Sequence, residues 1–234
     1  MFSLKHKVTI SDIAANEKMS VHAMISLLAN CEQFQIDAAP GFKEYYISRG
    51  YGIYLTARQA DIIRLPDYGE AVTVSTYVHE INVFYGVRNT FIYDAANNPI
   101  VKSYAIGANI DLAAKSPVRI DKEFVAGFKL DPKQEMFYAP RRIAVPDTVP
   151  QILPPFTVPD FFIDFYQHMN NVHYVTLALE CIKPRAITRV RAEYKAAAVA
   201  GDKIIPTVYR EENRATAVLA DGRGGAFAHI EITE

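Results

Sequence analysis

A group of polar side chains with acid–base chemistry lies close together near residue 170. Asp164 and His168 stand four residues apart, and Asn170 and Asn171 follow directly. A carboxylate can attack a carbonyl carbon or take a proton from water, and an imidazole can orient either reactant. Asparagine is common at helix starts, where unpaired backbone N–H groups can stabilise the negative charge developing on a carbonyl oxygen. The pattern indicates acyl transfer to water, although the same residue types also serve simply as helix caps.

Other residues with reactive side chains show no comparable pattern. Cys181 lies toward the end of an expected helix with no base at a predictable spacing, so it is more typical of a small core residue, as is Cys31. The histidines and cysteines lack the spacing of a zinc site. Neither a phosphate-binding glycine loop nor a G-x-S-x-G elbow is present. We therefore expect no metal and no cofactor.

The candidate residues need a helix to hold them. The apolar spacing predicts one over residues 170–182, directly after a proline-rich loop. A similar helix is predicted over residues 19–36, with Ser20 as its N-cap. Much of the remaining chain alternates apolar and polar residues, as strands do. Strands are predicted at residues 2–10, 51–63, 71–80, 84–93, 100–111, 135–145, 186–199, 203–211, 214–219 and 225–233.

The order of strand, helix and strands occurs twice along the chain. Residues 68–78 (YGEAVTVSTYV) align with residues 200–210 (AGDKIIPTVYR), and each segment has a glycine followed by an acid at the start of a strand. A repeat of about 110 residues indicates a duplicated domain and not a solenoid. We therefore predict an α+β fold with two tandem domains, each an antiparallel sheet around one central helix. The predicted parts are a first domain over 1–120, a connecting segment over 121–134 and a second domain over 135–234.

Only the second half of this repeat carries the acid and the imidazole. When Asp12 is aligned with Asp164, Asn16 takes the place of His168 and the asparagine pair is also missing. We therefore expect one catalytic centre, in the second domain.

Composition and charge exclude several classes of protein. The chain has 234 residues, with 25 Lys and Arg against 26 Asp and Glu, and a formal net charge of −1. General nucleic-acid-binding proteins usually have a basic excess, so nucleic acid is not expected as a partner. No apolar run approaches the length of about 18 residues that suggests a membrane span, and the N-terminus lacks the apolar core of a signal peptide. Two cysteines without a disulfide framework suit the cytoplasm.

The candidate segment resembles the catalytic segment of acyl-ACP thioesterases, which belong to the hotdog superfamily and carry two fused hotdog domains. The resemblance follows the pattern D-x-x-x-H-x-N-N-x-x-Y, formed by Asp164, His168, Asn170, Asn171 and Tyr174. It extends in order along the first half of the chain. The similar segments there are RLPDYGEAVTVSTYV at 64–78, YGVRNTFIYDAANNPIVKS at 85–103 and SPVRI at 116–120.

The resemblance implies a hydrolase that releases fatty acid from acyl carrier protein without a cofactor. In this reading Asp164 attacks the thioester carbonyl or activates a water molecule, and His168 orients or polarises the carbonyl. The asparagine pair binds substrate at the helix start, and the first domain shapes the acyl pocket. Two positions depart from the family. Its asparagine two residues after the acid is Tyr166 here, whose hydroxyl is expected to take part of that role, and its Glu-Cys pair falls on Ala197 and Ala198.

Other functions remain open. The departures at 166, 197 and 198 are compatible with an acyl-binding homologue of impaired catalysis, and an acyl-CoA thioesterase is a further alternative. A hotdog dehydratase is less favoured, because no H-F-P-like segment with a partnered acid is present. The basic residues between Lys183 and Lys195 could attract an acidic carrier protein, or could be one solvated face of a strand. A monomer and a homodimer are both compatible with the sequence.

Overall fold

The computed structural model describes residues 1–234 and divides into two compact units. The first unit comprises residues 1–56 and 63–138, and the second comprises residues 57–62 and 139–234. Strand β2 (Tyr51–Ile62) therefore contributes residues to both units. This division differs from the predicted boundaries, because residues 121–134 belong to the first unit and include a short helix, α3 (Lys122–Ala126).

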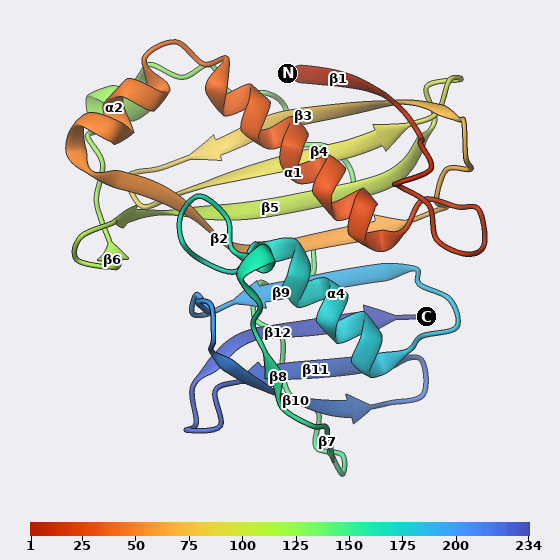
Figure 1. Cartoon of the computed structure of the whole chain (residues 1–234). Coiled ribbons are helices and arrows are strands. Elements are labelled where there is room, and N and C mark those ends of the chain that lie inside the picture. The colour runs from red at the N-terminus through yellow and green to blue at the C-terminus, as the bar shows by residue number, and fades with distance from the viewer. The chain divides into compact units, whose positions relative to one another are not determined.

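The first unit is an antiparallel sheet with one long helix across it. Its strand order is β1-β3-β4-β5-β2, and the short β6 pairs with β5. Helix α1 packs against β3, β4 and β1, as the upper part of Figure 1 shows. Its inward face includes Met24, Leu28 and Cys31, none of which has exposed surface. The other elements are β1 (Phe2–Lys7), α1 (Val21–Asp37), α2 (Phe42–Arg49), β3 (Ala71–Ile81), β4 (Tyr85–Tyr93), β5 (Pro99–Asp111) and β6 (Ser116–Pro117).

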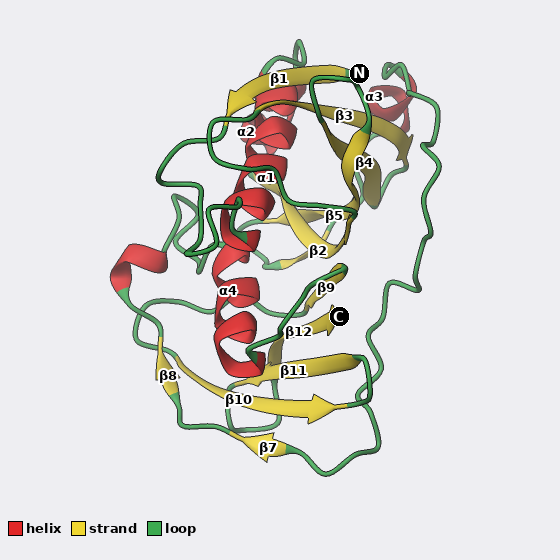
Figure 2. Cartoon of the chain, turned by 90° about the vertical axis from the view of Figure 1, so that its right-hand side faces the viewer, coloured by secondary structure: helices red, strands yellow, loops and turns green.

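The second unit repeats this arrangement. Residues 57–61 of β2 pair with β9, and the order continues through β12, β11, β10 and β7, all antiparallel. Helix α4 packs against β10, β11 and β12, which Figure 2 shows beside it. The elements are β7 (Gln151–Ile152), β8 (Phe156–Thr157), a 3-10 turn η1 (Asp160–Phe162), α4 (Asn171–Ile182), β9 (Arg189–Tyr194), β10 (Lys203–Arg210), β11 (Arg214–Ala220) and β12 (Ala226–Thr233). The predicted α+β class with two sheet-and-helix domains is confirmed.

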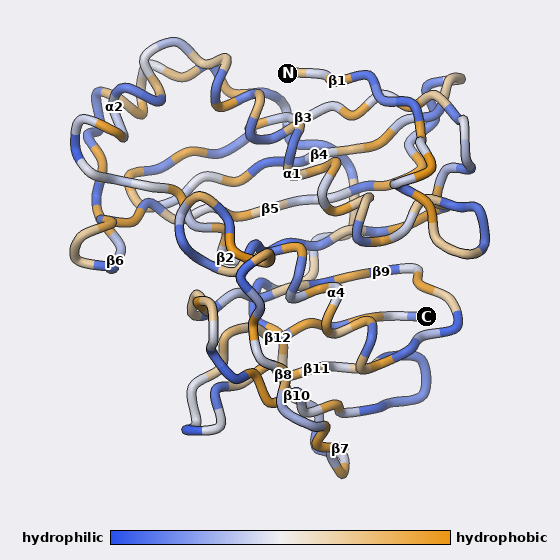
Figure 3. The backbone as a smooth tube through the Cα atoms, viewed as in Figure 1, coloured by the Kyte–Doolittle hydropathy of each residue, from blue (hydrophilic) through white to orange (hydrophobic).

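Local sequence explains the two long helices. The Ser20 side chain accepts a hydrogen bond from the backbone of Ala23 at 3.0 Å, and Asn170 accepts one from the backbone of Val172 at 3.1 Å. Each cap partners one of the N–H groups that a helix start leaves free. Apolar residues alternate with polar ones along much of the strands in each unit (Figure 3). No helix combines the length and the apolar character that crossing a membrane would require.

The predicted strand over residues 135–145 is wrong. This segment has bends and no strand partner, and side chains take up two of its backbone N–H groups. The backbone N–H of Ala139 donates to Gln59 Oε1 at 3.0 Å, and that of Ile143 donates to Glu193 Oε2 at 2.9 Å. The alternation seen in the sequence arises because Ala139 and Ile143 are buried while the residues between them are exposed. Proline at 140 also removes one donor that a strand ladder would use.

Candidate active site

Asp164 and His168 begin and end one tight turn in front of α4. The backbone N–H of Asp164 donates to the carbonyl of His168 at 2.8 Å. Gln167 adopts a left-handed conformation with φ of 64°, and its N–H donates back to the Asp164 carbonyl at 3.0 Å. Ile163 and Met169, the next residues outward, form an antiparallel bridge. The backbone therefore holds the acid and the imidazole at the two ends of one closed loop.

The side chains of this turn remain partly accessible. Asp164 and His168 are each half-buried, and one oxygen of the Asp164 carboxylate accepts the Tyr166 backbone N–H at 2.9 Å. The Tyr166 ring lies against Phe165, with ring centroids 3.9 Å apart. Asn170 uses its side-chain oxygen to cap α4. The structure thus brings the sequence-predicted residues together at the start of α4.

Few backbone donors are left at the helix start. The amide of Met169 donates to Ala198, that of Asn170 donates to Phe162, and that of His173 donates to Asn170, at 2.8, 2.9 and 3.0 Å. The Val172 amide is taken by the Asn170 side chain. The amide of Asn171 has no acceptor in the protein. Among the amides of residues 169–173, the amide of Asn171 is therefore the one that remains available to a ligand.

A segment after β9 lies over this helix start and fixes it. The Ala198 N–H donates to the hydroxyl of Tyr174 at 2.8 Å, while the Ala198 carbonyl receives the Met169 N–H. The Tyr194 hydroxyl donates to the Asn171 carbonyl at 3.2 Å. Burial raises the pKa of Tyr174 to about 12, so this hydroxyl stays neutral. Ala197, where the resembling family has glutamate, is an exposed residue of the same segment.

Aromatic side chains border the turn, which the sequence analysis did not single out. Phe161 and Phe165 are 80% and 75% exposed. Phe162 stacks on His173 with parallel rings whose centroids are 3.8 Å apart. The signal was present in the run FFIDFY at 161–166. An exposed aromatic border of this kind provides apolar contact area beside a polar turn.

The basic run of the second unit is largely neutralised. Arg189 pairs with Asp61, Arg191 pairs with Glu231 at 2.8 Å, and Lys195 pairs with Glu193 at 3.0 Å. These ion pairs leave less charge to attract an acidic partner than the sequence suggested, and they make the face ion-paired where the alternative expected it to be simply solvated. The alternative cysteine chemistry is also disfavoured, because burial raises the thiol pKa of both Cys181 and Cys31.

The first unit contains a turn with the same backbone. Ala14 donates to the carbonyl of Lys18 at 2.8 Å, and Glu17 is left-handed with φ of 62°, as Gln167 is in the second unit. The predicted alignment of Asp12 with Asp164 and of Asn16 with His168 is therefore two residues out of register. Ala14 occupies the position of Asp164, and Lys18 that of His168. The expectation that the first turn lacks an acid–imidazole pair holds with the corrected register.

Two tandem units of sheet and central helix define a double-hotdog protein. Within that class the chain belongs to the acyl-ACP thioesterase family, since the model of the acyl-ACP thioesterase N-terminal domain matches residues 1–128. Membership supports a hydrolase activity in general. No functionally curated protein matches the sequence.

Solved structures share the fold along nearly the whole chain. An acyl-ACP thioesterase from Bacteroides thetaiotaomicron superposes with a TM-score of 0.88 at 18% identity, covering 99% of this chain and 96% of the other. The 12:0-ACP thioesterase from Umbellularia californica superposes with a TM-score of 0.81 at 14% identity, covering 99% of this chain and 92% of the other. At such identities the likeness establishes the fold.

Proposed function

We propose that this protein hydrolyses the thioester of acyl-ACP and releases free fatty acid. The observation that carries the proposal is the closed turn that holds Asp164 and His168 directly before the unpartnered amide of Asn171. An acid, an imidazole and a free N–H at a helix start are the groups that thioester hydrolysis needs. Family membership and the two solved ACP thioesterases with the same fold support the carrier protein as the acyl donor.

The reaction follows from the positions of these groups. The thioester carbonyl oxygen accepts the Asn171 N–H, which stabilises the charge that develops as the carbonyl carbon is attacked. Asp164 takes a proton from water as the water oxygen bonds to that carbon, or attacks the carbon itself and is released by water in a second step. Where Asp164 acts as the base, the carbon–sulfur bond then breaks and the leaving sulfur takes up the proton that Asp164 holds. Where Asp164 attacks, the sulfur leaves as thiolate and is protonated by the proton released when water cleaves the acyl–Asp164 bond.

The remaining site residues orient the reactants. His168 fixes the direction of the carbonyl or of the attacking water. The Tyr166 hydroxyl replaces part of the hydrogen bonding of the family's asparagine. The cap formed by Asn170 keeps α4 aimed at the carbonyl. The apolar acyl chain then needs a separate surface, which we assign to the first unit, and the cytoplasm is the compartment that suits the two free cysteines.

A second candidate is an acyl-binding protein with impaired turnover. The observation that favours it is Ala197, which leaves no carboxylate on the exposed segment clamped over the helix start. If a second acid is required for turnover, Ala197→Glu is expected to raise the rate of hydrolysis. If Asp164 suffices, the same variant leaves the rate within a fewfold of wild type.

The test is thiol release from a panel of acyl-ACP and acyl-CoA substrates. Wild type is compared with Asp164→Asn and with Asp160→Asn, which removes the same charge from the exposed 3-10 turn four residues earlier. The proposal expects turnover that Asp164→Asn abolishes and Asp160→Asn retains. Absence of turnover by folded wild type on every substrate contradicts it and favours the acyl-binding protein. Faster release from CoA than from ACP identifies an acyl-CoA thioesterase.

A further inference from the structure

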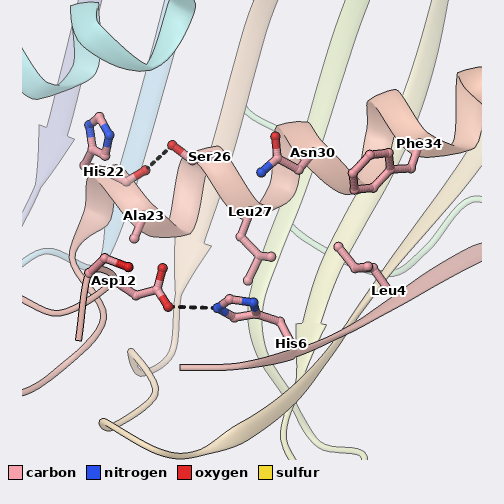
Figure 4. A pocket seen from close by; sticks show the side chains of 10 residues that line it. Leu4, His6, Asp12, His22, Ala23, Ser26, Leu27, Asn30 and Phe34 are labelled. Carbon is pink, nitrogen blue, oxygen red and sulfur yellow. Dashed lines mark hydrogen bonds and ion pairs between the residues drawn. The ribbon is translucent and has the colours of Figure 1, made fainter. Parts of the chain in front are cut away.

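The first unit contains a groove that none of the residues placed in the proposed reaction lines. It has a volume of about 400 Å³ and runs between β1 and α1 (Figure 4). Ligand sites in proteins commonly have volumes in this range. Its wall on one side is the strand residues Leu4 and His6, and on the other side it is α1 from His22 to Phe34.

One end of the groove is a fixed acid–imidazole pair. His6 Nε2 lies 2.9 Å from Asp12 Oδ2, and the backbone N–H and the hydroxyl of Thr9 each donate to that same oxygen at 2.7 Å. The other carboxylate oxygen of Asp12 and the second ring nitrogen of His6 have no hydrogen-bond partner in the protein. Figure 4 shows the free carboxylate oxygen pointing toward α1.

The protonation of Asp12 follows from its contacts. Burial raises the pKa of Asp12, but the hydrogen bonds from Thr9 and His6 outweigh burial and hold the pKa below its usual value. Asp12 is therefore ionised at neutral pH. The polar end of the groove consequently presents the free oxygen of an ionised carboxylate.

Apolar and polar side chains share the rest of the groove. Figure 4 shows Leu27 directed from α1 toward β1, with Phe34 farther along the helix and Leu4 on β1, while Ser26 and Asn30 also line the groove from α1. The eleven residue steps from Ala23 to Phe34 rise about 16 Å along the helix. Phe34 is 49% exposed at the far end, so the groove opens to solvent there. The groove is therefore long, has apolar contacts at Leu4, Leu27 and Phe34, and has a carboxylate at one end.

We propose that this groove binds a linear alkyl chain that ends in a primary ammonium group. The ammonium donates to the free oxygen of Asp12, and the chain lies over Leu27 and Leu4 toward Phe34. A fatty carboxylate is the wrong complement, because it brings a second negative charge to Asp12. The site is thereby distinct from one that would hold the fatty-acid product, and it stands independently of the proposed hydrolysis.

The first experiment measures the binding of dodecylamine, dodecanol and dodecanoate to the full chain by calorimetry, below the concentrations at which they aggregate. Dodecylamine is expected to bind tightest and dodecanoate weakest. Asp12→Asn is expected to weaken dodecylamine about tenfold, or about 1.4 kcal/mol. Asp67→Asn, which removes the same charge from an exposed residue outside the groove, is expected to leave binding unchanged. Equal weakening in both variants, or tighter binding of dodecanoate, overturns the proposal.

Two further measurements do not depend on the fold tolerating Asp12→Asn. Phe34→Ala alters an exposed side chain and is expected to weaken dodecylamine severalfold while leaving the shorter hexylamine unchanged. In wild type, the ¹⁵N spectrum of the histidine rings is expected to show the His6 signals moving when dodecylamine is added, because the amine binds to the carboxylate that His6 contacts. A His6 signal that does not move, with dodecylamine bound, shows that the amine lies elsewhere and contradicts the assignment.

Discussion

Replacing Tyr174 by phenylalanine tests how the helix start of the candidate site is held. Tyr174 is only 1% exposed, and its hydroxyl accepts the Ala198 N–H at 2.8 Å. The substitution removes that hydroxyl. The ring itself stays, together with its edge-on contact to Tyr194 at 5.8 Å between centroids. The change is therefore confined to one buried hydrogen bond.

The magnitude follows from what the lost bond leaves behind. Ala198 has no exposed surface, so its N–H cannot turn to water when the hydroxyl is absent. A buried donor left without an acceptor costs about 1–3 kcal/mol. We expect the free energy of unfolding to fall by that amount. We also expect the segment around Ala198 to detach more often from Met169, because only one of its two clamping hydrogen bonds remains.

Denaturant unfolding gives the first quantity, and hydrogen exchange of the Ala198 and Met169 amides gives the second. Tyr209→Phe is the control, because Tyr209 belongs to the same unit and its hydroxyl has no hydrogen bond in the structure. The control is expected to change stability by less than about 0.5 kcal/mol. If both variants have the same stability and the same amide exchange, the clamp does not hold the helix start.

Three other predictions concern residues elsewhere in the chain. Burial raises the pKa of Glu193, but hydrogen bonds to its carboxylate outweigh burial and lower the pKa, so the carboxylate stabilises the fold above the unfolded pKa of 4.5 and loses this effect as the pH falls through the folded pKa. Glu193→Gln is therefore expected to be less stable than wild type at pH 7. In unfolding curves below pH 4.5, the difference in stability between the two proteins is expected to narrow. A methyl group at Gly107 would lie 2.6 Å from Ile53 Cγ2, so Gly107→Ala is expected to cost about 1–3 kcal/mol in the same assay unless the Ile53 side chain rotates away. Burial raises the pKa of Cys31 to about 11, so a disulfide reagent is expected to modify Cys181 first and Cys31 only on unfolding; equal rates would contradict this.

The two long helices were predictable because their signals are local. The apolar spacing and the capping residues Ser20 and Asn170 lie within the helices themselves or directly before them. Helix α2 was missed because its stability depends on distant residues. Its Tyr45 stacks on Phe124, with ring centroids 3.5 Å apart, and Phe42 also contacts Phe128. No spacing within residues 42–49 announces those partners.

The candidate site was predictable in its residue types but not in its hydrogen bonds. The sequence placed Asp164, His168 and the asparagine pair before a helix, and the structure closes them into one turn. It could not show which amide at the helix start stays free. The amide of Asn171 is the free one, because the Ala198 carbonyl takes the Met169 N–H and other groups take the neighbouring amides. Residues separated by a helix and a strand had to be brought together first.

The duplicated fold separates what the turn needs from what its side chains do. The turns at 14–18 and 164–168 share the closing hydrogen bond of 2.8 Å and a left-handed residue at the fourth position. One has alanine and lysine at its ends, and the other has aspartate and histidine. Lys18 forms only a solvent-exposed pair with Asp67, of a kind worth about 0–1 kcal/mol. Because the backbone closes the turn with either pair of side chains, the fold does not require an acid and an imidazole there. Their presence in the second turn therefore favours a chemical role over a purely structural one.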